Sequence, residues 1–125
     1  MLESKLNKLL ANYEVEYHKL QTFHWYVKGH TFFQAHAKLE DYYNEAFEAI
    51  DEIAEKLLMI GGKPLANMDE FKANATISEA KGEFVTEKQV FATVKSDFEQ
   101  LLADIKDIKH DADRKSTRLN SSHLR

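Results

Sequence analysis

The chain has 125 residues, of which 43% are hydrophobic and 30% are charged, a composition typical of one globular domain and not of a disordered chain. It contains no cysteine, which excludes disulfides and thiolate metal sites and leaves His, Asp and Glu as candidate metal ligands. No apolar run approaches the ~20 residues of a membrane span, and the N-terminus does not resemble a signal peptide, so a cytoplasmic location is expected.

Charge is distributed unevenly along the chain. Residues 1–112 have a net charge of −7 and no arginine, whereas residues 113–125 have a net charge of +3 and contain all three arginines. The second segment reads like the translation of a common sequencing-library adapter, and the alternative is a natural Arg/Ser-rich tail that binds nucleic acid. We therefore predict one domain at residues 1–112 and a non-native tail at residues 113–125.

The first predicted helix extends from the N-terminus to about residue 27, and the sequence Lys28-Gly29-His30 ends it. Its apolar positions recur at steps of three and four, as on one face of an α-helix. These positions are Leu6, Leu10, Tyr13, Tyr17, Leu20, His24 and Val27.

The second predicted helix begins at Thr31, a favourable N-cap residue, and ends near Ile60. Gly61 and Gly62 supply a left-handed C-terminal stop, with Pro64 just beyond. At about 1.5 Å per residue, these ~30 residues form a rod of about 45 Å. Because so long a helix gains its stability from packing, it is expected to belong to a bundle.

Residues 65–84 connect to the third helix and are expected to contain one short helix around Met68–Ala73. The third helix opens at Thr86, and Gln89 three residues later completes a capping box. Three amphipathic helices with wide apolar faces need a fourth partner. The predicted fold is therefore all-α, a four-helix bundle whose fourth helix is missing, because the adapter-like segment begins where that helix should start.

On a helical wheel, the second helix has an apolar face, an acidic face and a seam between them. Four potential metal ligands share this seam: His36, Glu40, Asp51 and Glu55. They form two pairs with a spacing of four residues, and residues at that spacing are neighbours on a helix. The residues expected in the core are Tyr42, Ala46, Phe47, Ala49, Ile50, Ile53, Ala54, Leu57 and Leu58.

Simpler interpretations exist for each of these residues. A single acidic residue on a helix usually lies on a solvated face. His24 lies on the apolar stripe of the first helix, next to Trp25, and this pattern alone favours a core residue over a metal ligand. His18 and His30 are expected on the surface or in a loop, and His110 near a helix end. A helical interaction or structural protein with a merely solvated acidic face is the corresponding alternative function.

Residues 24–62 nevertheless resemble the signature of the miniferritins of the Dps family, named for DNA-binding proteins from starved cells. The resemblance rests on His24-Trp-Tyr-Val-Lys-Gly29, Phe32-Phe-Gln-Ala-His36, Glu40, Asp51-Glu-Ile-Ala-Glu55 and Gly61-Gly62, and it extends over about residues 4–112. It implies a ferritin-like four-helix bundle. It also implies a ferroxidase centre formed by His24, His36, Asp51 and Glu55 with help from Glu40, and a mineral-forming surface at Asp41, Glu45, Glu48 and Glu52.

The implied function is that of a ferroxidase-type oxidoreductase, which oxidises Fe(II) with hydrogen peroxide and stores ferric mineral, thereby protecting against oxidative stress. Hard carboxylate oxygens suit this role because they stabilise Fe(III) more than Fe(II), and imidazoles complete the ligand set. The residues alone do not choose between hydrogen peroxide and dioxygen. The Glu-x-x-His spacing of within-subunit di-iron sites occurs nowhere in the sequence, which argues against a site of that kind.

The implied partners are iron ions and further copies of the chain, which in this family build a shell of twelve subunits. The 125-residue chain without a fourth helix is not expected to be competent alone. DNA binding is not expected, because residues 1–112 are acidic and only Lys5 and Lys8 lie near the N-terminus. No membrane partner is expected.

Geometry predicts that the iron site lies between two subunits. His36 and Asp51 are 15 residues apart on one helix, hence about 22 Å apart along its axis, whereas ligand bonds are about 2 Å long. Two copies packed antiparallel about a two-fold axis near Glu45 and Ala46 bring His36 beside Glu55 of the partner subunit. The same axis brings Glu40 beside Asp51 of the partner subunit, and His24 would join from the subunit that contributes His36.

Overall fold

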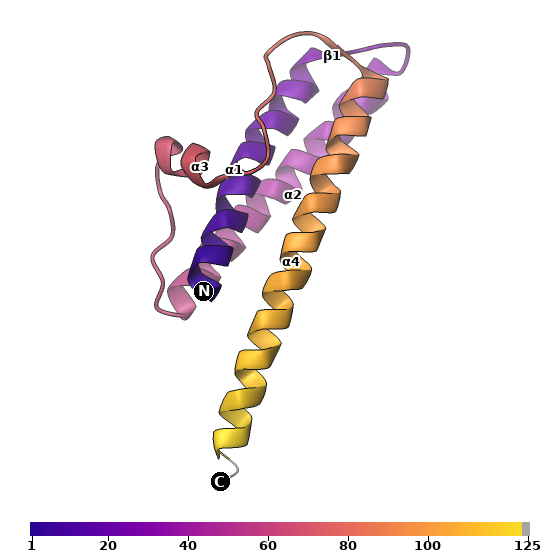
Figure 1. The fold of residues 1–125 in the computed structure, drawn as a ribbon. Coiled ribbons are helices and arrows are strands. Elements are labelled where there is room, and N and C mark those ends of the chain that lie inside the picture. Colours follow the sequence, from indigo (N-terminus) through magenta and orange to yellow (C-terminus); the bar gives the residue numbers. More distant parts are fainter. Residues whose placement is uncertain (124–125) are drawn as a thin grey trace.

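Three long helices and one short helix make up the described part of the chain (Figure 1). The computed structural model describes the backbone of residues 1–123 and the side chains of residues 1–114. The helices are α1 Leu2–Tyr26, α2 Phe32–Met59, α3 Met68–Asn74 and α4 Glu87–His123, and the two-residue strands β1 Val27–Lys28 and β2 Val85–Thr86 pair in parallel. The all-α prediction and the short helix in the connection are confirmed.

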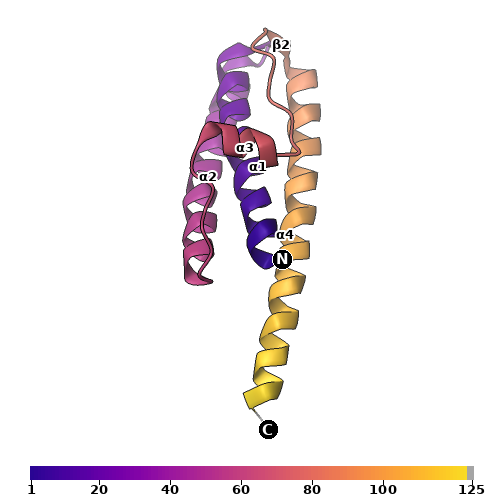
Figure 2. The same ribbon diagram turned by 60° about the vertical axis from the view of Figure 1, so that its left-hand side comes forward.

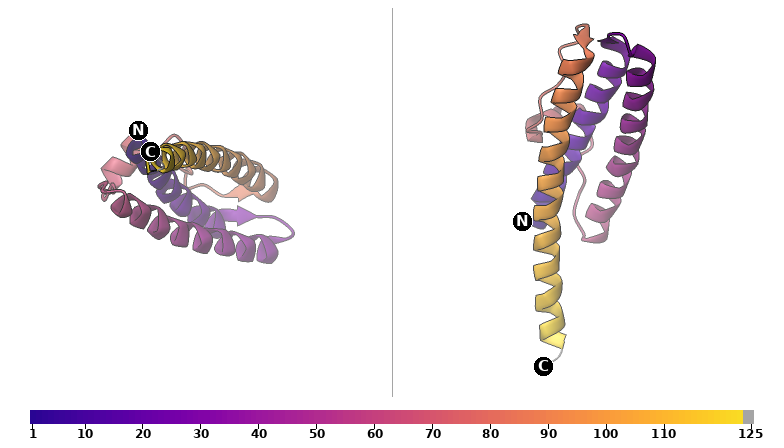
Figure 3. Two further views of the ribbon diagram at one scale, coloured as in Figure 1. Left: turned by 90° about the horizontal axis from the view of Figure 1, so that it is seen from below. Right: turned by 90° about the vertical axis from the view of Figure 1, so that its right-hand side faces the viewer.

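The helix α1 packs against both α2 and α4 and is antiparallel to each of them (Figures 1 and 2). The short helix α3 covers part of α1, as the view along the bundle and the side view show (Figure 3). Buried leucines lie where the long helices meet, and Leu10, Leu20, Leu39 and Leu57 are the largest fully enclosed apolar side chains. Among the described residues, no helix is both long enough and apolar enough to cross a membrane.

The end of α2 follows its local sequence. Gly61 has a φ of +78°, the Gly61 N–H donates to the carbonyl oxygen of Leu58 at 3.1 Å, and the Gly62 N–H donates to that of Leu57 at 2.8 Å. This pair of bonds is the Schellman motif, in which a left-handed residue reverses the chain and satisfies the last carbonyls of the helix. The predicted glycine stop is therefore confirmed.

Thr31 precedes α2 as predicted, but its hydroxyl does not cap this helix. The Thr31 hydroxyl donates instead to the Glu87 carboxylate at the start of α4, and the Thr31 N–H donates to the same group at 2.9 Å. Gly29 has a φ of +150°, and a Cβ there would collide with the Glu87 carboxylate. The two hydrogen bonds from Thr31 to Glu87, which we call the Thr31–Glu87 clamp, connect the turn between α1 and α2 to the start of α4.

Polar contacts join the N-terminal half of α1 to the rest of the molecule. The Lys5 ammonium forms ion pairs with Asp107 at 2.9 Å and with Asp111 at 2.7 Å, both on α4. The amide oxygen of Asn12, a fully buried residue, accepts hydrogen bonds from the backbone N–H groups of Thr76 and Ile77. The connection between α3 and α4 is thereby held against α1.

Two parts of the structure differ from the sequence expectation. The helix α4 continues through Asp113 to His123 and extends past the other helices (Figures 1 and 2), since no Gly or Pro follows Gly82 to stop it. The side chains of the predicted tail beyond Arg114, and residues 124–125 altogether, lie outside the described residues. Phe47 and Leu58, expected in the core, are 54% and 63% exposed.

Candidate metal centre

The turn between α1 and α2 brings His24 and His36 together. His24 lies in the last turn of α1 and is 6% exposed, and His36 lies early in α2. Their rings stack with centroids 3.5 Å apart and planes 14° apart, and the Phe32 ring stacks on His36 with a centroid distance of 5.1 Å. Two histidines 12 residues apart in sequence therefore share one place in the fold.

Reciprocal hydrogen bonds orient the two imidazoles. The Nδ1 of His24 lies 2.5 Å from the carbonyl oxygen of His36, and the Nδ1 of His36 lies 2.7 Å from the carbonyl oxygen of His24. Because a carbonyl oxygen can only accept a hydrogen bond, each Nδ1 must carry the proton. In the neutral ring the lone pair then resides on Nε2, which is the form that coordinates a metal while its other nitrogen donates to the protein.

Glu40 and Tyr43 border the histidine pair from the next turns of α2. The Oε1 of Glu40 lies 3.8 Å from the Nε2 of His24, and the Glu40 side chain is 52% exposed. The Tyr43 ring meets the His24 ring edge-on with centroids 5.4 Å apart. Burial and the nearby Glu40 carboxylate raise the pKa of Tyr43. Three of the five predicted ligands are thus brought together at one end of α2.

Asp51 and Glu55 are not brought to this place. Both lie in the second half of α2, and both are exposed. Within the described part of the chain, no group of three or more His, Cys, Asp or Glu side chains is arranged to hold a metal ion. The chain therefore presents two parts of the candidate centre: a histidine half with Glu40 and, separately, a carboxylate half with Asp51 and Glu55.

Exposed apolar side chains accompany these ligands along α2. Phe33, Phe47 and Leu58 are 81%, 54% and 63% exposed. At about 100° per residue, they share a sector of about 100° with the ligands. We call this sector the α2 stripe; it comprises Phe33, His36, Glu40, Phe47, Asp51, Glu55 and Leu58.

The α2 stripe is symmetric about the point between Glu45 and Ala46. Phe33 precedes that point by as many residues as Leu58 follows it, just as His36 and Glu55 are equally distant from it. Large apolar side chains gathered on an exposed face are typical of an interaction surface. The exposure of Phe47 and Leu58 was not predicted, because the helical wheel placed both at the margin of the apolar face, beside the ligands, and that face was expected to be buried.

The remaining acids of α2 face solvent. Asp41, Glu45, Glu48 and Glu52 are all exposed, which fits both a mineral-forming surface and an ordinary solvated face.

The other histidines lie outside the candidate centre. His18 and His30 are exposed, as predicted. His110 is also exposed, but it does not lie at a helix end as expected, because α4 continues past it. Trp25, the sequence neighbour of His24, is 59% exposed.

Comparisons with known proteins support one assignment. The ferritin-like domain family matches residues 3–120. The "DNA protection during starvation protein 2" of Bacillus anthracis is 46% identical over 101 residues, which are 81% of this chain and 68% of that protein. "General stress protein 20U" of Bacillus subtilis is 44% identical over 101 residues, 81% of this chain and 69% of that protein. The crystal structure of a Dps protein from Bacillus brevis superposes with a TM-score of 0.88 at 36% identity, over 98% of this chain and 82% of that chain.

Proposed function

Because the chain belongs to the Dps family of ferritin-like proteins, we propose that it oxidises and stores iron and thereby protects the cell from oxidative stress. Two relatives are named for starvation and for general stress, which supports a protective role. In this proposal Fe(II) is the substrate of a ferroxidase, hydrogen peroxide is the oxidant, and ferric mineral is the stored product. The site residues are His24, His36, Glu40, Asp51 and Glu55.

The observation that carries this proposal is the pair of reciprocal hydrogen bonds between His24 and His36. A histidine that only fills a core has no need of a particular tautomer, whereas a metal ligand needs a free Nε2 and a fixed ring. Both rings satisfy this requirement, and Glu40 adds a carboxylate beside His24. Nitrogen and oxygen ligands of this kind suit iron.

The second half of the site comes from a partner subunit. An antiparallel pair of α2 helices crossing between Glu45 and Ala46 sets His36 beside Glu55 of the partner subunit. It also sets Phe33 beside Leu58 of the partner subunit, and this packing would cover two of the most exposed apolar side chains of α2. The same two-fold axis between Glu45 and Ala46 thus pairs both the ligands and the exposed apolar residues. This agreement supports an isologous dimer with two equivalent sites.

The reaction needs electrons and protons to balance. Two ferrous ions release one electron each, and hydrogen peroxide takes up two electrons and two protons to become two water molecules, so no hydroxyl radical is released. The carboxylates favour the ferric product because hard oxygen ligands bind the higher charge more strongly. Ferric ions would then collect at the exposed acids of α2, Asp41, Glu45, Glu48 and Glu52.

We further propose how the protein assembles, where it is located and which residues form its domain. The dimers build a hollow shell of this chain, and the location is cytoplasmic. Residues 1–112 form the domain, and residues 113–125 are a non-native tail. The chain's exposed apolar residues and acidic charge support assembly with itself over binding to DNA. Lys5, one of two lysines near the N-terminus, is moreover engaged by two carboxylates of α4.

A mixing experiment tests the shared site. Protein from the uninterrupted gene is prepared as two inactive variants, His24→Gly with His36→Gly, and Asp51→Ala with Glu55→Ala. Random pairing makes half of the dimers mixed, each with one intact site of two, so about a quarter of the wild-type Fe(II) oxidation should return. If mixed dimers form, as shown by mass spectrometry, and no activity returns, the site does not lie between subunits. Calorimetry that detects no iron binding to the wild type would instead favour a structural protein.

A further inference from the structure

Two carboxyl groups and one ammonium group meet in the interior between α1 and α4. Glu16 of α1 is 0% exposed, and Lys19, one turn later on the same helix, is 6% exposed. Asp97 of α4 joins them: its Oδ2 lies 2.8 Å from the Lys19 Nζ, and its carboxyl group is a hydrogen-bonding neighbour of Glu16. We call these three residues the Glu16 triad.

The triad has more buried acceptors than donors. In the described part of the chain, neither oxygen of Glu16 receives a hydrogen bond. The Oδ2 of Asp97 forms an ion pair with Lys19 but receives no well-aligned hydrogen bond from the described residues. An ionised carboxylate can only accept hydrogen bonds, so two ionised carboxylates cannot bond to each other. A proton on Glu16 removes this difficulty, because a protonated carboxyl group can donate to Asp97.

The charges of the triad lead to the same conclusion. With both carboxyl groups ionised, Lys19 compensates one negative charge and leaves the other uncompensated inside the protein. Burying such a charge is costly, and two carboxyl groups that share one site therefore retain a proton between them. Because Lys19 lies against Asp97, the proton belongs on Glu16. Burial, followed by the hydrogen bond with Asp97, raises the pKa of Glu16 to about 9, and Lys19 opposes the shift.

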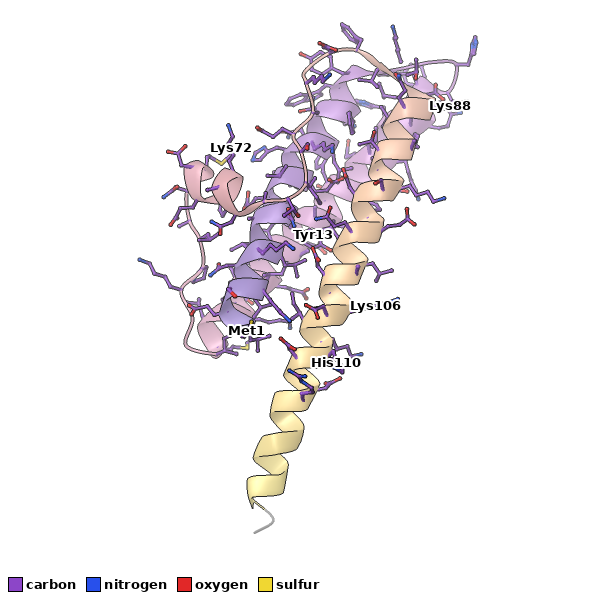
Figure 4. The ribbon with its side chains drawn as sticks, viewed as in Figure 1. Met1, Tyr13, Lys72, Lys88, Lys106 and His110 are labelled. Atoms are coloured by element: carbon purple, nitrogen blue, oxygen red, sulfur yellow. The ribbon has the colours of Figure 1, made fainter. Side chains whose placement is uncertain are left out.

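The surrounding ionisable groups do not compensate the triad. Glu16 lines a cavity together with Tyr13 on α1 (labelled in Figure 4) and with Tyr42 and Glu45 on α2. None of these three groups is cationic, and burial raises the pKa of Tyr13. Lys19 borders a second hollow together with Glu14 and His18 on α1, Lys72 on α3 and Glu79 in the connection. Since Lys72 pairs with Glu79 at 3.6 Å, Lys19 has to serve both buried carboxyl groups.

We propose that the Glu16 triad is a proton-binding site that joins α1 to α4 and lowers the stability of the fold as pH rises. A proton suits this site better than a metal ion does, because Lys19 already supplies one positive charge. Among the described residues, moreover, no group of three or more potential metal ligands is arranged to hold an ion.

The direction of the pH dependence follows from linkage. Folding raises the pKa of Glu16 above its ordinary value of 4.5, so between that value and about 9 the native state binds more protons than the unfolded chain does. The stability that the protonated pair contributes is therefore fully present at acidic pH. It is lost gradually as pH rises across this window.

NMR of the 125-residue chain with isotope-labelled glutamate carboxyl groups tests the site directly. A carboxyl carbon signal moves when its group ionises, and the signal absent from Glu16→Gln identifies Glu16. We expect its titration midpoint to lie about two pH units or more above that of Glu99, an exposed acid on α4. Asp97→Asn should lower the Glu16 midpoint by about one pH unit or more, because the partner carboxyl group is lost and Lys19 is released to Glu16. A Glu16 midpoint equal to that of Glu99, or one that Asp97→Asn leaves unchanged, would overturn the proposal.

Urea unfolding at several pH values tests the effect on stability. Between about pH 6 and pH 8, the unfolding equilibrium constant of the wild type should rise at least ~10-fold relative to that of Glu16→Gln, with a limit of about 100-fold for one proton. Glutamine imitates the protonated carboxyl group at every pH, because it is neutral and can donate a hydrogen bond. Glu99→Gln is the matched control and should keep the wild-type pH dependence. The same pH dependence in Glu16→Gln as in the wild type would show that the triad does not control stability.

Discussion

The two halves of the candidate iron site differ in how firmly the chain holds them. His24 and His36 come from two helices, stack on each other and are oriented by hydrogen bonds to each other's backbone. Asp51 and Glu55 come from one helix and are exposed. Ordering a free carboxylate side chain costs conformational entropy, and in the proposed dimer that cost would arise on assembly. In the proposed site, a single subunit orders the two histidines by itself, whereas Asp51 and Glu55 would be ordered only when a partner subunit packs against them.

The largest expected effect comes from removing the carboxylate half. Asp51→Ala with Glu55→Ala should slow the fast phase of Fe(II) oxidation at least ~100-fold, because two ligands per site are lost. Since both residues are exposed, the melting temperature should change little. Stopped-flow absorbance measures the rate, and Asp69→Ala with Glu83→Ala, two exposed acids away from α2, is the matched control. A fast phase of unchanged rate would remove both residues from the site.

A smaller effect is expected when the ligands stay and the apolar contacts of the stripe are changed. Phe33→Asp with Leu58→Asp should weaken the dimer by ~30-fold or more, because the proposed interface would bury these exposed side chains. Oxidation should fall at low protein concentration and recover at high concentration, as mass action requires. Sedimentation velocity measures the dimer. Met59→Asp changes a residue that is 81% exposed on another side of α2 and should have no such effect. An unchanged dimer in the double variant would place the interface elsewhere.

The smallest effect concerns the support of the histidine half. Glu87→Ala removes the Thr31–Glu87 clamp, which holds the turn between the two histidines against α4. Hydrogen bonds from Thr31 lower the pKa of the Glu87 carboxyl group, so its contribution to stability is present above its ordinary pKa and is lost as pH falls through the lowered value. The apparent KM for Fe(II) should rise ~3- to 10-fold at neutral pH, with a small change in kcat.

Glu83→Ala is the control for this change, because Glu83 is an exposed acid in the connection between α3 and α4, close in sequence to Glu87. Steady-state oxidation over a range of Fe(II) concentrations makes the measurement. Equal KM values for Glu87→Ala and the wild type would mean that the histidine pair is held without the clamp.

Local sequence signals were sufficient to predict the helices, and they also nominated the candidate ligands. The periodicity of apolar residues marked α1, α2 and α4, and the Gly61 stop placed the end of α2 within one residue of where the structure has it. The pairs at a spacing of four residues on one seam of α2 named His36, Glu40, Asp51 and Glu55 without reference to any other helix. These features depend on residues close in the chain, whose geometry the helix itself imposes.

Features that depend on distant residues emerged only from packing. The hydroxyl of Thr31 serves Glu87, 56 residues away, and not its own helix. Glu16 and Lys19 are buried although both are charged, because α1 is packed against α3 and α4 as well as α2. Phe47 stays 54% exposed although its ring lies 5.9 Å from that of Tyr17 on α1, and Leu58 is 63% exposed. A helical wheel shows which residues share a face, but which face another helix covers is decided by contacts between segments far apart in sequence.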